Sequence, residues 1–320
     1  MKVYVGLDSS NYTSSAAVFA PEVGILANCR RLLPVKEGEM GLRQSDAVFH
    51  HTRQLPEMIE AALEEGRRAA GGDFSLAAIG VSVRPRDAEG SYMPCFLAGE
   101  AMARSMAAAT GRPLRRFSHQ AGHIAAALYS AGRMELMGER FIAFHVSGGT
   151  TEAVLVTPDV HTVFRCEIIA RSLDLKAGQA VDRVGGMLGL PFPAGPMLEE
   201  LALRGRSPIP ARPTLRGADC CLSGLENQSR QLLERGCAKE DVARYALDAI
   251  CAALDGMTKA LLESYGPLPL LFAGGVMSNQ IIRRKLTEKY GAFFAQPAFS
   301  ADNAAGIALL AARCADGQEE

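Results

Sequence analysis

The sequence lacks an excess of charge of either sign. Its 320 residues hold 34 lysines and arginines against 35 aspartates and glutamates, which gives a formal net charge of -1. Nucleic-acid-binding domains are usually strongly basic, so the chain as a whole does not have that character. The composition does not exclude a local basic patch that binds RNA. The near-neutral charge balance also suits a chain that works inside a complex.

Paired cysteine motifs and long apolar runs are also missing. None of the 8 cysteines forms a C-x-x-C pair. No apolar run reaches the roughly 18 residues that a membrane span needs. Residues 1–7 alternate apolar and polar side chains, which predicts a strand and not a signal peptide. We therefore expect reduced thiols, a cytoplasmic location and no contact with a membrane.

Apolar sequence is plentiful, since hydrophobic residues make up 48% of the chain, and the length suggests about two domains. The pattern predicts strands at 3–8, 15–19, 24–31, 76–82, 141–147, 151–157, 163–170, 268–273 and 292–295. It predicts helices at 46–66, 98–110, 178–188, 196–204, 222–236, 239–265, 279–290 and 302–316. Because three strands in a row occur twice, we expect two related lobes. Two unrelated α/β domains would give the same pattern.

Two histidines four residues apart form the first candidate site. Ser118 is a good helix N-cap, so His119 and His123 fall on one face of the helix that it begins. That spacing lets two imidazoles bind one metal ion, although a bare H-x-x-x-H more often means two partly buried histidines. A third ligand must come from elsewhere. Asp302, at the start of the last helix, is a candidate that can equally be a simple cap.

Glycine-rich turns that follow buried strands form the second group. Ser147, Gly148 and Gly149 follow one strand, and Gly275 and Asn279 lie between another strand and a helix. Such turns let backbone N–H groups approach a phosphate, and a helix start favours an anion. An ordinary hairpin turn or loop would have the same sequence pattern.

Two acidic residues near other glycine-containing turns complete the set. Asp182 and Glu199, the latter just after Gly195, can accept hydrogen bonds from ribose hydroxyls. Each of them alone is as well explained by a surface charge or a helix cap.

In this order and spacing, the segments resemble the TsaD/Gcp family, also called the Kae/Qri family, whose members make threonylcarbamoyladenosine in tRNA. The matching segments, spread from residue 3 to residue 311, are Asp8-Ser9-Ser10, His119 with His123, Val146 to Gly149, Gly178 to Asp182, Pro193 to Pro196, Ser223 to Leu225, Ala273 to Asn279 and Ala301 to Asn303. The resemblance implies the α/β fold of actin, Hsp70 and sugar kinases, with two duplicated lobes and a central cleft. We expect residues 1–118 and 300–320 to form the N-terminal lobe, and residues 119–299 to form the C-terminal lobe.

The resemblance also implies a metal and a nucleotide. One iron or zinc ion would be held by His119, His123 and Asp302, with His145 as a fourth ligand where some members have a tyrosine. The implied adenylate contacts are Ser147, Gly148, Gly149, Asp182, Gly195, Glu199, Gly275 and Asn279.

The implied reaction uses ATP or threonylcarbamoyl-AMP as the nucleotide and passes a threonylcarbamoyl group to the adenosine beside the tRNA anticodon. The expected partners are tRNA and proteins similar to TsaB or TsaE. No catalytic side chain is assigned. The family was formerly described as glycoproteases. This sequence does not support that activity, because it shows no activated nucleophile.

Several family positions are changed in this chain. Asn11 and its neighbours replace an acidic pair, Gln179 replaces a glutamate, and Thr150 replaces a histidine. These changes are typical of a diverged paralog. An ATPase, another carbamoyl or phosphoryl transfer, and a nucleotide-binding scaffold therefore stay as alternatives. The retained His119, His123 and Asp302 count against the scaffold, which has no need of a metal.

Overall fold

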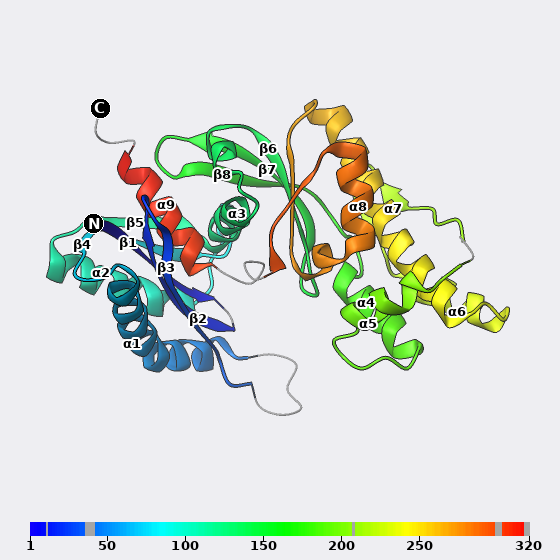
Figure 1. Ribbon diagram of the computed structural model, residues 1–320, viewed down its shortest axis with the longest axis horizontal. Helices are drawn as coiled ribbons and strands as arrows, with labels where there is room; N and C mark the ends of the chain where they lie inside the picture. The colour runs from blue at the N-terminus through cyan, green and yellow to red at the C-terminus, as the bar shows by residue number, and fades with distance from the viewer. Residues whose placement is uncertain (11, 36–41, 207–208, 298–302, 317–320) are drawn as a thin grey trace. The chain divides into compact units, whose positions relative to one another are not determined.

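The computed structural model in Figure 1 describes residues 1–10, 12–35, 42–206, 209–297 and 303–316. The chain divides into two compact units. Unit 1 comprises Met1–Glu139, Thr157–Cys166 and Ala301–Glu320, and unit 2 comprises Arg140–Val156 and Glu167–Ser300. No helix in the described ranges is long and apolar enough to span a bilayer.

Unit 1 is built on a five-stranded sheet in the order β3-β2-β1-β4-β5. Its elements are β1 (Lys2–Ser10), β2 (Thr13–Ala20), β3 (Gly24–Leu32), α1 (Gln44–Ala69), β4 (Ser75–Arg84), α2 (Phe96–Thr110), β5 (Leu114–Ser118), α3 (His119–Ser130), a 3-10 turn η1 (Met134–Gly138) and α9 (Ala304–Asp316). Strand β1 is antiparallel to β2 and parallel to β4, and β4 is parallel to β5. Strand β5 was not predicted from the sequence.

The two faces of β1 meet different helices, because side chains alternate along a strand. Val3, Val5 and Leu7 belong to a buried cluster that includes residues of α1 and α2. Gly6 faces the other way, since a Cβ atom there would overlap the carbonyl oxygen of Ala304 in α9. Asp8 follows Gly6 by two residues, so it lies on the α9 face of the sheet.

Helices α3 and α9 pack with their backbones in close approach. A Cβ atom on Gly306 would overlap the carbonyl oxygen of Gly122 and lie 2.9 Å from the backbone nitrogen of Ala126. This packing joins α3 to unit 1. Residues 119–139 and 157–166 thus cluster with unit 1, whereas the sequence pattern predicted them in the C-terminal lobe.

Unit 2 holds the second five-stranded sheet, in the order β12-β11-β6-β7-β8. Its elements are β6 (Phe141–Val146), β7 (Thr151–Asp159), β8 (Val163–Arg171), α4 (Ala177–Met187), α5 (Gly195–Leu203), β9 (Thr214–Arg216), β10 (Asp219–Cys221), α6 (Gly224–Glu234), α7 (Lys239–Tyr265), β11 (Leu270–Ala273), a 3-10 turn η2 (Gly275–Ser278), α8 (Gln280–Tyr290) and β12 (Phe293–Phe294). Some residues of β7 and β8 cluster with unit 1. Strand β6 is antiparallel to β7, whereas β11 is parallel to both β6 and β12.

The two sheets repeat one topology. Read from the opposite edge, the second order is β8-β7-β6-β11-β12, which matches β3-β2-β1-β4-β5 strand by strand. In each sheet the first strand of the run is antiparallel to the next and parallel to the first later strand. The predicted duplication is therefore confirmed.

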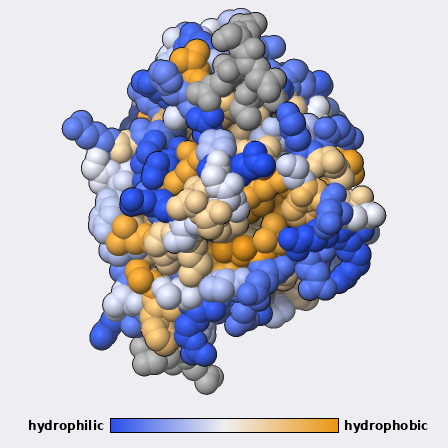
Figure 2. Space-filling model, turned by 90° about the vertical axis from the view of Figure 1, so that its left-hand side faces the viewer, coloured by the Kyte–Doolittle hydropathy of each residue, from blue (hydrophilic) through white to orange (hydrophobic). Residues whose placement is uncertain are grey.

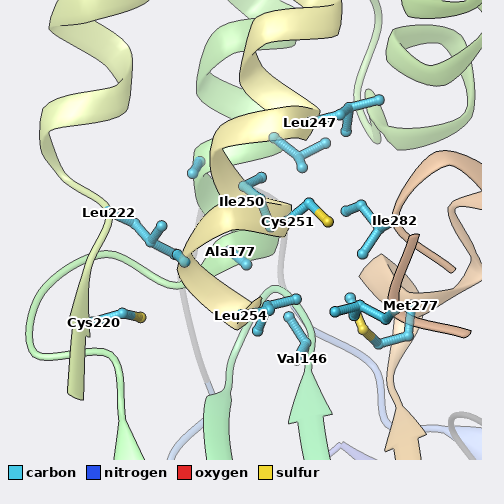
Figure 3. Packing of buried hydrophobic residues seen from close by; sticks show 14 of the residues in the cluster. Val146, Ala177, Cys220, Leu222, Leu247, Ile250, Cys251, Leu254, Met277 and Ile282 are labelled. Carbon is cyan, nitrogen blue, oxygen red and sulfur yellow. The ribbon is translucent and has the colours of Figure 1, made fainter. Parts of the chain in front are cut away.

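Helix α7 forms the centre of the unit 2 core. Its residues Leu247, Ile250 and Leu254 are each at most 1% exposed. In Figure 3 Leu254 lies just above Val146, at the end of β6, and beside Met277 of η2, with Ile250 and Leu247 further up the helix. This core holds the ends of β6 and β11, where the two glycine-rich turns begin.

Unit 1 exposes several large apolar side chains. Phe49 of α1, Tyr92 in the segment before α2 and Leu97 of α2 are 56%, 61% and 49% exposed. Figure 2 shows one face of the molecule, on which hydrophobic residues gather in patches between hydrophilic ones. Such patches are typical of surfaces that contact other molecules.

Candidate functional site

A cavity of about 290 Å³ lies within unit 2. It is lined by Gly148, Gly178, Val181, Asp182, Pro193, Gly195, Pro196, Glu199, Leu247, Gly275, Val276, Ser278 and Asn279. Six of the eight predicted adenylate contacts are in this lining, and the other two, Ser147 and Gly149, stand on either side of Gly148 in the sequence. Five separate segments of the sequence thus meet at one space.

The turn after β6 is held rigidly by its own side chain. The Ser147 hydroxyl oxygen accepts the backbone N–H groups of Gly149 and Thr150, at 3.3 and 3.1 Å. Helix α4 begins directly against this turn, because the Gly178 N–H donates to the Ser147 carbonyl oxygen at 3.1 Å. A Cβ atom on Gly178 would lie 2.5 Å from the Gly148 nitrogen, so only glycine fits there.

The two carboxylates of the cavity are each held by one oxygen. Asp182 Oδ1 accepts the backbone N–H of Ala194 at 2.9 Å, and Glu199 Oε1 accepts that of Gln280 at 2.7 Å. Within the described ranges, the second oxygen of each carboxylate has no hydrogen-bond partner. Each side chain is therefore fixed in place and keeps an acceptor for a ligand.

The turn after β11 presents backbone to the cavity. A Cβ atom on Gly275 would meet nothing within 4 Å, so this face is open. Asn279 is 8% exposed, and its Oδ1 caps α8 by accepting the N–H groups of Ile281 and Ile282, both at 3.1 Å. The cap fixes the asparagine and leaves its amide nitrogen for another contact.

The lining combines apolar side chains with carboxylate acceptors. Leu247, Val181 and Val276 supply apolar contact, and Asp182 and Glu199 supply negative charge. None of the lining residues is basic. This chemistry fits a flat ring with donating hydroxyl groups, such as a nucleoside, and requires any phosphate to be met by backbone N–H groups.

Asp174 was not predicted to have a role, yet it ties two parts of unit 2 together. Its oxygens accept the N–H groups of Leu175 and Leu222 at 2.6 and 2.7 Å, and the Ser223 hydroxyl at 2.6 Å. Ser223 directly precedes α6 and opens the Ser-Gly-Leu segment of the family pattern. Burial alone would raise the pKa of Asp174, but the hydrogen bonds from Ser223, Leu222 and Leu175 lower it to about 2.

Replacing Asp174 is expected to lower stability in a pH-dependent way. Because the pKa is about 2 in the folded chain and 3.8 ordinarily, the ionised group stabilises the fold above pH 3.8 and loses this effect as pH falls towards 2. The side chain is exposed, so solvent screening reduces the expected contribution to about 1 kcal/mol. Urea unfolding of Asp174→Asn should show this deficit near neutral pH and a smaller one in acid. The exposed Asp73→Asn is the control, and a deficit independent of pH would contradict the assignment.

The two predicted metal-ligating histidines lie together in unit 1. Ser118 caps α3 by accepting the Ala121 N–H at 3.1 Å, as predicted. The ring centroids of His119 and His123 are 4.6 Å apart, with the rings at 74°. His119 Nδ1 lies 2.9 Å from Asp8 Oδ1, on the α9 face of the sheet.

The other predicted ligands are placed differently. Asp302 lies outside the described residues, but its neighbour Asn303 is described, and the Asn303 amide nitrogen is 3.5 Å from His119 Nε2. His145 belongs to unit 2, at the end of β6, where its ring lies beside Gly274. Among the described residues, no three side chains of the metal-binding types gather into one site.

The donor chemistry of the histidine pair fits a borderline metal such as iron or zinc. Two imidazoles one helical turn apart, with rings in contact, can share an ion. Each is partly exposed, so an ion can reach it. The nearby Asp8 Oδ2 and Asn303 Oδ1 are buried without a hydrogen-bond partner among the described residues, which is unusual for a purely structural site.

Solved structures with similar folds share little sequence with this chain. Component A of (R)-2-hydroxyglutaryl-CoA dehydratase from Acidaminococcus fermentans has a TM-score of 0.56 at 16% identity, over 98% of this chain and 100% of that one. HypF from T. kodakarensis has a TM-score of 0.62 at 15% identity, over 99% of this chain but only 48% of HypF. The ROK hexokinase of Thermus thermophilus has a TM-score of 0.50 at 19% identity, over 98% of this chain and 99% of that one.

These similarities show the fold alone, which is that of actin, Hsp70 and the sugar kinases, as expected from the sequence. The family is shown by a different comparison. The sequence model of TsaD, described as tRNA N6-adenosine threonylcarbamoyltransferase, matches residues 37–309. That range is most of the chain and contains every residue of the unit 2 cavity. The chain therefore belongs to the TsaD family, a family of transferases that act in tRNA modification.

Proposed function

We propose that this chain transfers a threonylcarbamoyl group from threonylcarbamoyl-AMP to the adenosine beside the tRNA anticodon. The observation that carries the proposal is the unit 2 cavity, where six predicted adenylate contacts line one space. The family supplies the class of reaction. The cytoplasm is the proposed location.

The adenylate is proposed to bind with its base against Leu247 and Val276. Its ribose hydroxyls donate to the second oxygens of Asp182 and Glu199, since the first oxygens are bound by backbone N–H groups, and the carboxylate charge strengthens these bonds. Its phosphate lies at the turn around Gly148, where the start of α4 favours negative charge. ATP would use the same contacts.

A metal ion, iron or zinc, is part of the proposal. His119, His123 and Asp302 would hold it, and His145 remains a proposed fourth ligand. When bound, such an ion supplies Lewis-acid polarisation of a carbonyl group.

The chemical step needs no protein nucleophile. The N6 amine of the acceptor adenosine attacks the carbamoyl carbon, the bond from that carbon to the phosphate oxygen breaks, and AMP leaves as N6 loses a proton. The chain's own part is to hold the donor in one orientation, by the carboxylates and by the rigid turn after β6.

Partners are also proposed. tRNA is the acceptor, and proteins similar to TsaB or TsaE are expected to bind the chain. The exposed Phe49, Tyr92 and Leu97 of unit 1 would suit a protein contact.

A second candidate function is another carbamoyl or phosphoryl transfer, or ATP hydrolysis, by a diverged paralog. The observation that favours it is the change at positions near the cavity. Gln179, where the family has a glutamate, uses its side-chain oxygen to accept the Lys176 N–H at 3.3 Å and so caps α4. Thr150, where the family has a histidine, stands in the turn after β6.

A purified assay separates the two candidates. The wild-type chain, with tRNA, threonylcarbamoyl-AMP and TsaB- and TsaE-like proteins, should yield threonylcarbamoyladenosine, detected by mass spectrometry of digested tRNA. Glu199→Gln should reduce the initial rate about 10-fold or more at limiting donor, because a hydrogen bond to a charged group is lost. Glu200→Gln is the matched control, since Glu200 is exposed and does not line the cavity.

Release of AMP or ADP without modified tRNA, at a rate that Glu199→Gln reduces and Glu200→Gln does not, would favour the second candidate. Equal rates for both variants would contradict the placement of the donor in this cavity.

A further inference from the structure

A buried carboxylate contacts the first histidine of the pair. Asp8 Oδ1 lies 2.9 Å from His119 Nδ1, and the Asp8 side chain is only 1% exposed. Ser82, on the neighbouring strand β4, donates its hydroxyl to the same oxygen. The carboxylate is thus anchored by the sheet and directed at one nitrogen of one ring.

The contacts of His119 define which nitrogen carries its proton. A carboxylate only accepts, so Nδ1 must donate to Asp8. On the other side of the ring, the Asn303 amide nitrogen, which only donates, is 3.5 Å from Nε2. Both contacts agree on a neutral ring with its proton on Nδ1 and its lone pair on Nε2.

The contacts of Asp8 satisfy one of its oxygens and leave the other without a partner among the described residues. Its second oxygen, Oδ2, is buried without a hydrogen-bond partner among the described residues. Its contacts among the described residues are a histidine and hydroxyl groups, and none of them is a lysine or arginine. A buried carboxylate oxygen without a partner is unusual in a purely structural role, so its presence indicates a task beyond packing.

We propose that Asp8 is a positioning residue for a metal ion: it accepts the Nδ1 proton of His119 and thereby directs the Nε2 lone pair of that ring to the ion. A carboxylate behind a ligating histidine fixes the ring's tautomer and orientation and raises its basicity. The inference rests on the proposed metal site. It adds to that site a residue from the far end of the sequence, 111 positions before the histidine.

The test measures Zn²⁺ and Co²⁺ affinity of the full chain by competition with a chelator. Asp8→Asn should bind either ion about 10- to 100-fold more weakly than the wild type. Ser82→Ala, which keeps the Asp8 carboxylate, should change affinity much less, and Asp174→Asn controls for loss of a hydrogen-bonded carboxylate elsewhere. His119→Ala reports whether the ion uses this ring.

A second measurement tests the proposal on the wild-type chain, even if Asp8→Asn does not fold. The ¹⁵N chemical shifts of the wild-type histidines, assigned with His119→Ala, report the tautomer of His119 in the metal-free chain. The proton is expected on Nδ1, and in Asp8→Asn the two tautomers are expected to be mixed.

The possible failures are distinct. If the wild type binds no metal, both the proposed metal site and the proposed role of Asp8 are wrong. If the wild type binds metal through His119 but Asp8→Asn binds it equally well, or if His119 carries its proton on Nε2, the metal site stands and the inference about Asp8 is overturned.

Discussion

Replacing both carboxylates of the cavity, by Asp182→Asn and Glu199→Gln together, is expected to weaken AMP binding by about 100-fold or more. Each residue offers one oxygen that is not used by the backbone, while Oδ1 of Asp182 and Oε1 of Glu199 stay bonded to Ala194 and Gln280. The amides keep the size of the side chains but lose the charge that strengthens a hydrogen bond from a hydroxyl. Isothermal titration of the wild type and the variant measures the difference.

Two neighbouring substitutions provide the control for this experiment. Arg183→Gln and Glu200→Gln change charged, exposed residues that directly follow Asp182 and Glu199 but do not line the cavity. They should leave AMP affinity within about 3-fold, since exposed charges contribute little. If the double variant binds AMP as tightly as these controls, the nucleotide lies elsewhere.

Gly306→Ala is expected to lower the free energy of unfolding by about 3 kcal/mol or more. The new Cβ atom would overlap the Gly122 carbonyl oxygen and approach the Ala126 nitrogen at 2.9 Å, and both are backbone atoms of a helix. Helix α3 would have to shift, and His119 and His123 would shift with it. Chemical denaturation, with the midpoint followed by circular dichroism, measures the effect.

The matched control is Gly186→Ala in α4. A Cβ atom there would meet nothing within 4 Å, and the residue is exposed. Alanine in a helix is favoured over glycine by up to about 1 kcal/mol, so this variant should be unchanged or slightly more stable. A Gly306→Ala chain that is as stable as this control would contradict the close packing of α3 on α9.

Much of the fold follows from local patterns. The largely apolar runs at residues 3–8 and 15–19 stand on either side of a polar turn, and they pair as β1 and β2. Strand β5 was missed because Arg115 and Arg116 interrupt its apolar pattern. The pair β9 and β10 was missed because three residues are too few to show a period.

The cavity was predictable in its residue types but not in its detail. Glycines at strand ends and acids near them indicated Gly148, Gly275, Asp182 and Glu199, and the structure brings these residues together. Leu247 carries no such signal, because one apolar residue of a long helix has the same pattern as the rest of the core.

Contacts between distant parts of the sequence could not be derived from it. Asp8 and His119 meet because the end of β1 and the start of α3 come together in unit 1, and only the tertiary structure sets that arrangement. Asp174 and Ser223 likewise meet across 49 residues. Motif spacing identifies the segments but not the hydrogen bonds that join them.

Restoration of threonylcarbamoyladenosine in cells that lack their own enzyme is the most direct measurement of the proposed function. Expression of the wild-type chain should return the modified nucleoside to the tRNA of these cells, as detected by mass spectrometry. Glu200→Gln should do the same, and the combined Asp182→Asn and Glu199→Gln chain should not. A wild-type chain that is produced, folded and able to bind AMP, yet leaves the tRNA unmodified, would contradict transfer to this adenosine.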